Sequence, residues 1–127
     1  MNLYSFNNKV FAAFFLLLFF SNSLYSLNFM TVSELKPGMK GYGLSVFKNT
    51  EPETFGVEII SILKNTSPSR DLILIKCSGQ NLEKSRIIAG MSGSPVYINN
   101  KLIGALAYAW SLSLDPIAGV TPIESML

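Results

Sequence analysis

The chain contains no histidine and has only one cysteine, one tryptophan and a small charged fraction among its 127 residues. Histidine is the usual base for a serine nucleophile and a common zinc ligand, so its absence removes both the usual triad and the usual metal-site patterns. The single cysteine, Cys77, cannot form an internal disulfide. A charged fraction of 14% and a net charge of +2 give no basic field, so nucleic acid is not an expected partner. We expect no cofactor and no metal.

Residues 1–26 have the pattern of a signal peptide, and residues 27–127 have the length of one domain. Lys9 gives the positive flank, and residues 10–20 form an apolar run that is short for a membrane span of about 20 residues. Small residues suitable for cleavage follow at Ser21, Ser23 and Ser26. We expect export to the periplasm, the cell envelope or the medium. An uncleaved anchor is the alternative, and it would be the expected membrane contact.

The remaining chain alternates short apolar strands with turns rich in glycine, proline, asparagine and serine, which is typical of an all-β barrel. The expected strands are 41–47, 54–63, 72–75 and 117–120, with a loop at 64–70, and two more strands lie on either side of a turn at residues 99–101. In the first strand, residues 42, 44 and 46 share a face, and its two glycines indicate a bulge or a close backbone approach.

Two short helical turns are expected near the ends of the domain. Thr31 and Glu34 have the spacing of a capping box. Thr121, Pro122 and Glu124 have the pattern of a helix start only a few residues before the last residue. We therefore expect the chain to be the N-terminal part of a longer protein. The alternative is a docked turn held by three apolar side chains: Ile123, Met126 and Leu127.

The most informative stretch is residues 90–95, Gly-Met-Ser-Gly-Ser-Pro, which leads into two apolar strands joined by an Asn-Asn-Lys turn at residues 99–101. Gly90 and Gly93 allow backbone angles that other residues avoid. A tight turn of this kind can expose a hydroxyl and aim backbone N–H groups into the same space, as acyl transfer requires. At this level the alternative is a glycine-rich turn whose serines bond only nearby backbone.

This hexapeptide, its hairpin and the segment 107–110 resemble the nucleophile segment of chymotrypsin-like serine peptidases. The closer resemblance is to the SpoIVB (stage IV sporulation protein B) peptidase family, whose serine stands in the same hexapeptide. The similarity continues through residues 53–60 and 119–127. It implies a chymotrypsin-like (trypsin-like) β-barrel, incomplete if the chain is a fragment.

The resemblance also implies roles for particular residues. Ser92 matches the nucleophile, and the backbone N–H groups of Gly90 and Ser92 match the oxyanion hole. Residues 107–110 would lie beside the pocket for the residue before the scissile bond. The implied partner is a peptide or protein substrate.

Two catalytic roles of the family have no match in this sequence. The family's histidine has no counterpart, and its aspartate falls at or beside Cys77 and Ser78. A lysine could act as base only if it were desolvated, and Lys84 and Lys101 are expected to face solvent.

Two functions therefore remain open. The first is an exported serine peptidase domain that is inactive alone, or a fragment whose base comes from other sequence or from a partner. The second is a non-catalytic exported β-barrel module that binds peptides or has a structural role. The substrate and the oligomeric state stay open.

Overall fold

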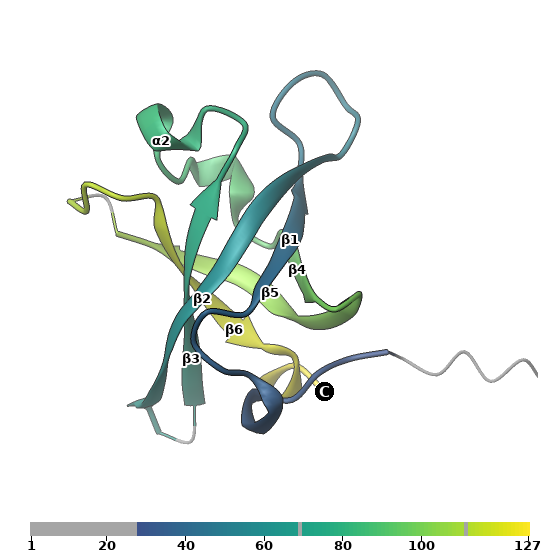
Figure 1. The fold of residues 1–127 in the computed structure, drawn as a ribbon, viewed down its shortest axis with the longest axis vertical. Coiled ribbons are helices and arrows are strands. Elements are labelled where there is room, and N and C mark those ends of the chain that lie inside the picture. The colour runs from purple at the N-terminus through teal and green to yellow at the C-terminus, as the bar shows by residue number, and fades with distance from the viewer. Residues whose placement is uncertain (1–27, 69, 111) are drawn as a thin grey trace, which may run out of the picture.

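The computed structural model describes residues 28–68, 70–110 and 112–127 (Figure 1). The expected signal segment and its cleavage site lie outside these residues. Within them, no helix is long and apolar enough to cross a membrane.

Six strands form a closed barrel, which confirms the predicted all-β fold. They are β1 (Lys40–Ser45), β2 (Glu53–Ser67), β3 (Arg70–Ser78), β4 (Pro95–Ile98), β5 (Lys101–Ala109) and β6 (Ile117–Pro122). Their order around the barrel is β1-β2-β3-β6-β5-β4, and β1 pairs with β4 to close it. Every neighbouring pair is antiparallel. In Figure 1 the long β2 and β3 cross in front of β5 and β6.

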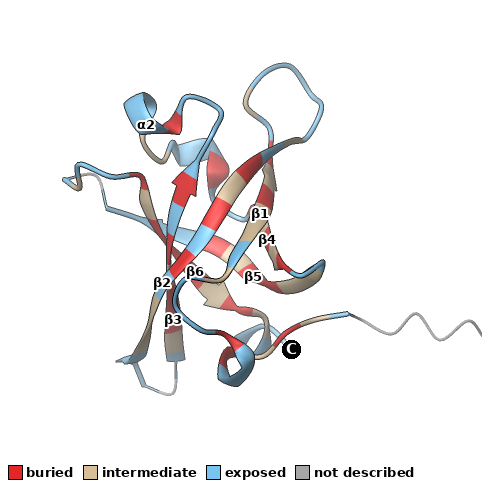
Figure 2. Cartoon of the chain, viewed as in Figure 1, coloured by how far each residue is buried: buried red, intermediate tan, exposed pale blue. Residues whose placement is uncertain are grey.

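The core lies inside the barrel because alternate residues of each strand point inward (Figure 2). Fully buried side chains come from every strand from β2 to β6, including Phe55, Ile75, Val96, Ile103 and Val120. A short helix, α2 (Leu82–Ser85), adds Leu82 to this core from one end of the barrel.

The glycines of β1 allow a close approach, as the sequence predicts. A Cβ atom at Gly43 would collide with the ring of Phe55, and one at Gly41 would collide with the carbonyl oxygen of Tyr97. On the other face of β1, the ring of Tyr42 stacks on that of Tyr97 with centroids 5.1 Å apart. The register of β1 with its two partners is regular, so the alternative of a bulge is not realised there.

Two predicted boundaries are wrong. The expected loop at 64–70 is shorter, because β2 continues to Ser67 and β3 begins at Arg70. The expected helix start at residues 121–124 is strand as far as Pro122, and only a 3₁₀ turn, η3 (Ile123–Ser125), follows. Thr121 pairs with Ala105 in the sheet, so strand pairing outweighs the local helix signal.

Two local predictions are confirmed. In the 3₁₀ turn η1 (Val32–Glu34), the Glu34 carboxylate accepts hydrogen bonds from the Thr31 amide at 2.8 Å and the Thr31 hydroxyl at 2.9 Å. These bonds lower the pKa of Glu34. Asn99 and Asn100 both have positive φ, which two-residue hairpin turns require.

Candidate active site

Ser92 lies on a short turn between the end of α2 and β4. We call residues 88–94 the serine turn; it includes the 3₁₀ turn η2 (Ala89–Met91). Met91 is fully buried and anchors the turn in the core, whereas Ser92 is exposed. The Ser92 hydroxyl therefore lies at the surface, while the residue before it, Met91, is fixed by its packing in the core.

Two backbone hydrogen bonds join the serine turn to β5. The Gly93 N–H donates to the Leu106 carbonyl at 2.7 Å, and the Leu106 N–H donates to the Ser94 carbonyl at 2.9 Å. Gly93 has φ +85°, so the predicted need for a glycine is confirmed at this position. The φ of Gly90 is not positive, so the same expectation fails at Gly90 in this structure.

A groove of about 270 Å³ opens beside Ser92. Besides Ser92, its lining consists of apolar or aromatic residues from the serine turn and β5: Ile87, Ile88, Ala89, Leu106, Ala107, Tyr108 and Ala109. The predicted position of residues 107–109 beside a pocket agrees with this lining. Trp110 instead lines a neighbouring hollow with Leu74 and Ile117.

One edge of β5 is open next to Ser92. The pairing of β5 with β4 ends at Ala105, while its pairing with β6 continues to Ala109. The register shift between Leu106 and Tyr108 makes Ala107 a bulge. Among the described residues, no strand pairs with residues 107–109 on the β4 side; we call this stretch the open edge.

The direction of the backbone groups at the open edge follows from alternation along the strand. The Trp110 N–H donates to the Ile117 carbonyl at 3.3 Å, toward β6. Since successive residues of a strand direct their backbone groups to opposite sides, the N–H and C=O of Ala109 face the open side. They are positioned to pair with an added strand.

The amide of Ser92 already has an acceptor. Its N–H donates to the Ala89 carbonyl at 3.2 Å, as the last bond of the 3₁₀ turn. The resemblance assigns this N–H to the oxyanion hole, and in this conformation the N–H is not free to bind an oxyanion. The sequence alone gave no signal of this bond.

The residues at the position of the family's aspartate offer no carboxylate. Cys77 is fully buried in β3, and burial raises the pKa of its thiol to about 12. Ser78 is exposed at the end of the same strand. Cys77 is thus an unreactive core residue.

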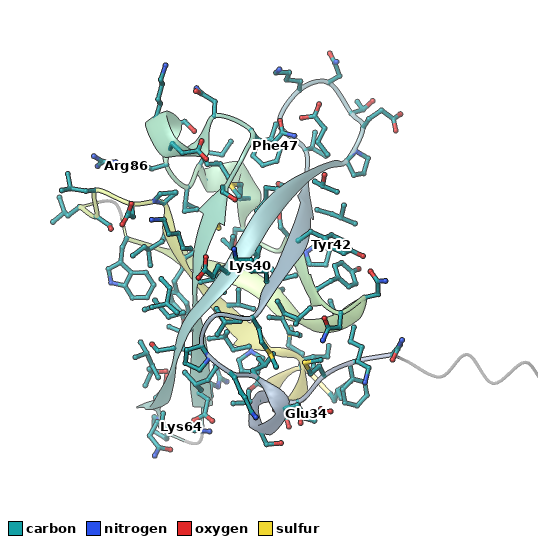
Figure 3. The ribbon with its side chains drawn as sticks, viewed as in Figure 1. Glu34, Lys40, Tyr42, Phe47, Lys64 and Arg86 are labelled. Atoms are coloured by element: carbon teal, nitrogen blue, oxygen red, sulfur yellow. The ribbon has the colours of Figure 1, made fainter. Side chains whose placement is uncertain are left out.

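Three lysines among the described residues do not qualify as a desolvated base near the turn: Lys64, Lys76 and Lys84. Lys64 bonds Asp71 at 2.8 Å, with 63% of its side chain exposed. It lies at the end of the barrel opposite Arg86, which precedes the serine turn (Figure 3). Lys76 pairs with Asp115 at 3.1 Å, and Lys84 is exposed as predicted.

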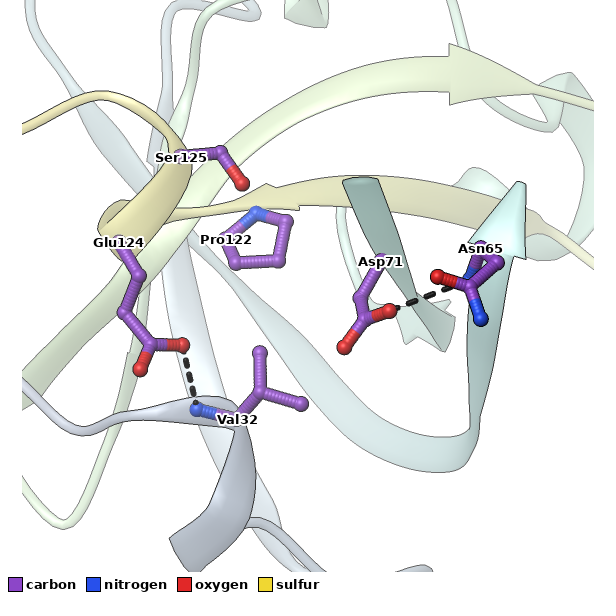
Figure 4. Close-up of a pocket in the computed structure, with 6 residues that line it drawn as sticks. All are labelled: Val32, Asn65, Asp71, Pro122, Glu124 and Ser125. Carbon is purple, nitrogen blue, oxygen red and sulfur yellow. Dashed lines mark hydrogen bonds between the residues drawn. The ribbon is translucent and has the colours of Figure 1, made fainter. Parts of the chain in front are cut away.

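A second cavity, of about 300 Å³, lies on the Lys64 side of the barrel (Figure 4). It brings together residues from both ends of the domain: Val32, Asn65, Asp71, Pro122, Glu124 and Ser125. Both carboxylates have partners, since Glu124 accepts from the Val32 N–H and Asp71 accepts from the Asn65 N–H. The cavity therefore lies where turns from distant parts of the sequence meet, and the sequence analysis did not predict it.

The closed antiparallel barrel and the exposed serine on a glycine-flanked turn define a single barrel of the chymotrypsin-like serine peptidase type. A family model described as SpoIVB peptidase S55 matches residues 21–127. The chain belongs to the SpoIVB peptidase family. No curated protein and no solved structure matches the chain in the corresponding searches.

Proposed function

We propose that this SpoIVB-type peptidase domain presents Ser92 as the nucleophile of a site that acts on an extended polypeptide, with a general base supplied from outside these 127 residues. The observation that carries the proposal is the position of Ser92. Its turn is bonded to β5 at Leu106, so the hydroxyl lies where the open edge begins. Membership of the family supports a protein substrate.

An extended peptide can bind by adding a strand at the open edge. The outward N–H and C=O of Ala109 would pair with its backbone, as in other cases of strand addition. One side chain of the peptide would then enter the groove beside Ser92. Backbone pairing supplies affinity that does not depend on sequence, while the groove selects a side chain.

The base must come from elsewhere because the chain has no histidine. A serine hydroxyl without a base stays protonated and is a poor nucleophile. Lys64 and Lys76 are held by Asp71 and Asp115, and both are substantially exposed. A histidine from other sequence of the protein or from a partner would complete the site.

The second candidate is a non-catalytic exported module that binds peptides at the same edge. One observation favours it: the Ser92 N–H is already bonded to Ala89, so the turn is not arranged for an oxyanion. In that case Ser92 has no chemical role, and the open edge alone carries the function.

The two candidates separate in one experiment. The purified chain is treated with a fluorophosphonate in the presence of imidazole, which stands in for the missing base, in parallel with a library of extended peptides whose binding is measured. Labelling that disappears in Ser92→Ala supports the nucleophile. Peptide binding that survives Ser92→Ala, without any labelling, supports the non-catalytic module.

We further propose export of the domain across a membrane. Lys9, the apolar run 10–20 and the small residues after it support this proposal. Peptide substrates outside the cytoplasm would then be accessible to it.

A further inference from the structure

We infer that the oxyanion hole of this site is closed at rest and that the substrate opens it, by reversal of the peptide bond between Ala89 and Gly90. The inference rests on the proposed function and concerns how the same site is regulated. It starts from two backbone bonds in the serine turn. The Met91 N–H donates to the Ile88 carbonyl at 3.0 Å, and the Ser92 N–H donates to the Ala89 carbonyl at 3.2 Å.

The first of these bonds closes a four-residue turn, Ile88 to Met91, with Ala89 and Gly90 at its centre. In its 3₁₀ form it is a turn of type I, which any residue can adopt at the position of Gly90. Reversal of the central peptide converts type I into type II. The Met91 bond to Ile88 is kept, and φ at Gly90 becomes positive.

A glycine at position 90 suits the type II turn rather than the type I turn of the resting structure. Its φ is not positive here, and a Cβ atom at this position would meet nothing within 4 Å. Neither backbone strain nor space therefore requires glycine in the resting turn. Type II turns do require glycine or asparagine at this place. The sequence is thus matched to a conformation that the resting structure does not show.

The reversal has a direct chemical consequence at Ser92. It turns the Ala89 carbonyl away and turns the Gly90 N–H toward the space that this carbonyl leaves. The Ser92 N–H then loses its acceptor and is free. Both N–H groups that acyl transfer needs become available together.

The substrate can drive this change because it binds the two forms differently. In the resting form, the carbonyl oxygen of a bound peptide meets the Ala89 carbonyl, and the two oxygens repel. In the reversed form, the same oxygen accepts two hydrogen bonds. Ala89 also lines the groove with Ile88, so an apolar side chain that enters the groove brings the scissile carbonyl to the residue that must turn.

The test uses a short peptide with an apolar last residue and a C-terminal boronic acid. The Ser92 Oγ–B bond forms, the hydroxyl proton passes to water, and the boron becomes a tetrahedral anion that mimics the oxyanion. In the wild-type chain we expect the ¹H–¹⁵N resonances of Gly90 and Ser92 to move on binding. The Met91 resonance should move little, since its bond to Ile88 is kept.

Variants at Gly90 give effects of opposite sign. Gly90→Ala should keep the melting temperature and weaken boronate binding by about tenfold, because L-residues disfavour positive φ. D-alanine at the same position should strengthen binding. It can be introduced by ligating synthetic residues 77–127, which begin with Cys77, to residues 1–76. Gly79→Ala is the matched control: its φ is +77° at rest, so it should lower the melting temperature and leave boronate binding unchanged.

The inference is overturned if boronate binding depends on Ser92 but Gly90→Ala binds as tightly as the wild type. It is also overturned if L- and D-alanine change the affinity in the same direction, because a merely structural role would do so. If no form of the chain binds the boronate better than Ser92→Ala does, the nucleophile itself is absent and the proposed function fails with the inference. Binding seen in the D-alanine chain but not in the wild type supports a closed resting hole.

Discussion

The Glu124 carboxylate accepts a hydrogen bond from the Val32 backbone N–H at 3.0 Å, across 92 positions of sequence. It joins η3 to η1 and satisfies one of the N–H groups that the first turn of a helix leaves free. Met126 and Leu127 are about half exposed or more, so they do not hold η3 in the way the docked-turn hypothesis expected. The Glu124 side chain makes that contact.

Glu124→Ala should therefore lower the stability of the barrel by about 1 kcal/mol, the usual cost of losing one such bond. Glu124→Gln keeps an acceptor and should lose less. Urea unfolding followed by tryptophan fluorescence measures both. Equal stability of the alanine variant and the wild type would show that the contact contributes nothing.

Gly43→Ala should be severely destabilising, by several kcal/mol, because the new Cβ atom collides with the buried ring of Phe55. Adding Phe55→Leu should restore part of the loss, since the two sites share the same space. Leu44→Ala, on the outer face of the same strand, is the control and should cost much less. Thermal unfolding monitored by circular dichroism is sufficient. A Gly43→Ala chain as stable as the Leu44→Ala chain would contradict the packing described for β1.

Asp71 should titrate below its ordinary value of 3.8, because hydrogen bonds from Lys64 and from the Asn65 N–H lower its pKa. A lowered pKa in the folded state stabilises the fold above the ordinary value, and that stabilisation is lost as pH falls through the folded value. Lys64 is exposed and Asp71 is partly exposed, so solvent screens the pair and the effect on stability is small. Lys64→Met should move the pKa upward, as followed by ¹³C NMR of the carboxyl group. Lys76→Met should leave the pKa of Asp71 unchanged, because Lys76 pairs with Asp115. A shift in Lys76→Met and none in Lys64→Met would contradict the assignment of the effect to Lys64.

The chain alone should show no efficient cleavage of peptides. It lacks a histidine, and a triad enzyme without one of its members retains only about 10³–10⁴-fold acceleration over water. Slow hydrolysis of an activated ester, whose leaving group needs no proton, is expected and should decrease in Ser92→Ala. Rapid peptide cleavage that Ser92→Ala abolishes would instead reveal another base. Lys84 and Lys101 would then be the first residues to replace.

Expression in an exporting host should give a mature chain that begins near Leu24 or Leu27. The small residues at Ser21, Ser23 and Ser26 are the expected recognition sites for cleavage. Mass spectrometry of the intact protein measures the new N-terminus. A product that retains Met1 and stays with the membrane would support an anchor.

Features set by neighbouring residues were predictable from the sequence. The Asn99–Asn100 hairpin, the Thr31–Glu34 cap and the exposure of Ser92 each depend on residues a few positions apart, and they are present as expected. The strand and turn pattern predicted the barrel, and the family resemblance added its chymotrypsin-like type; the closed order of the six strands confirms the barrel.

Features that depend on distant partners or on a choice between similar conformations were not predictable. Thr121 belongs to a strand because Ala105 lies beside it, and Glu124 finds its donor at Val32. Whether the Ala89 carbonyl points toward or away from Ser92 is a choice between two turns with the same sequence and nearly the same end points.

Because Ala107 is a bulge, a mutation there can change the site without disrupting the barrel. Leu106 opposes Val120 and Tyr108 opposes Gly119, so Ala107 is one residue more than the β5–β6 pairing needs. Losing a single codon at this position would leave the pairing and the inward residues of both strands in phase. The same loss would remove a wall of the groove and shift the backbone that follows Leu106. A relative could thus keep a stable barrel and lose its substrate through one deletion.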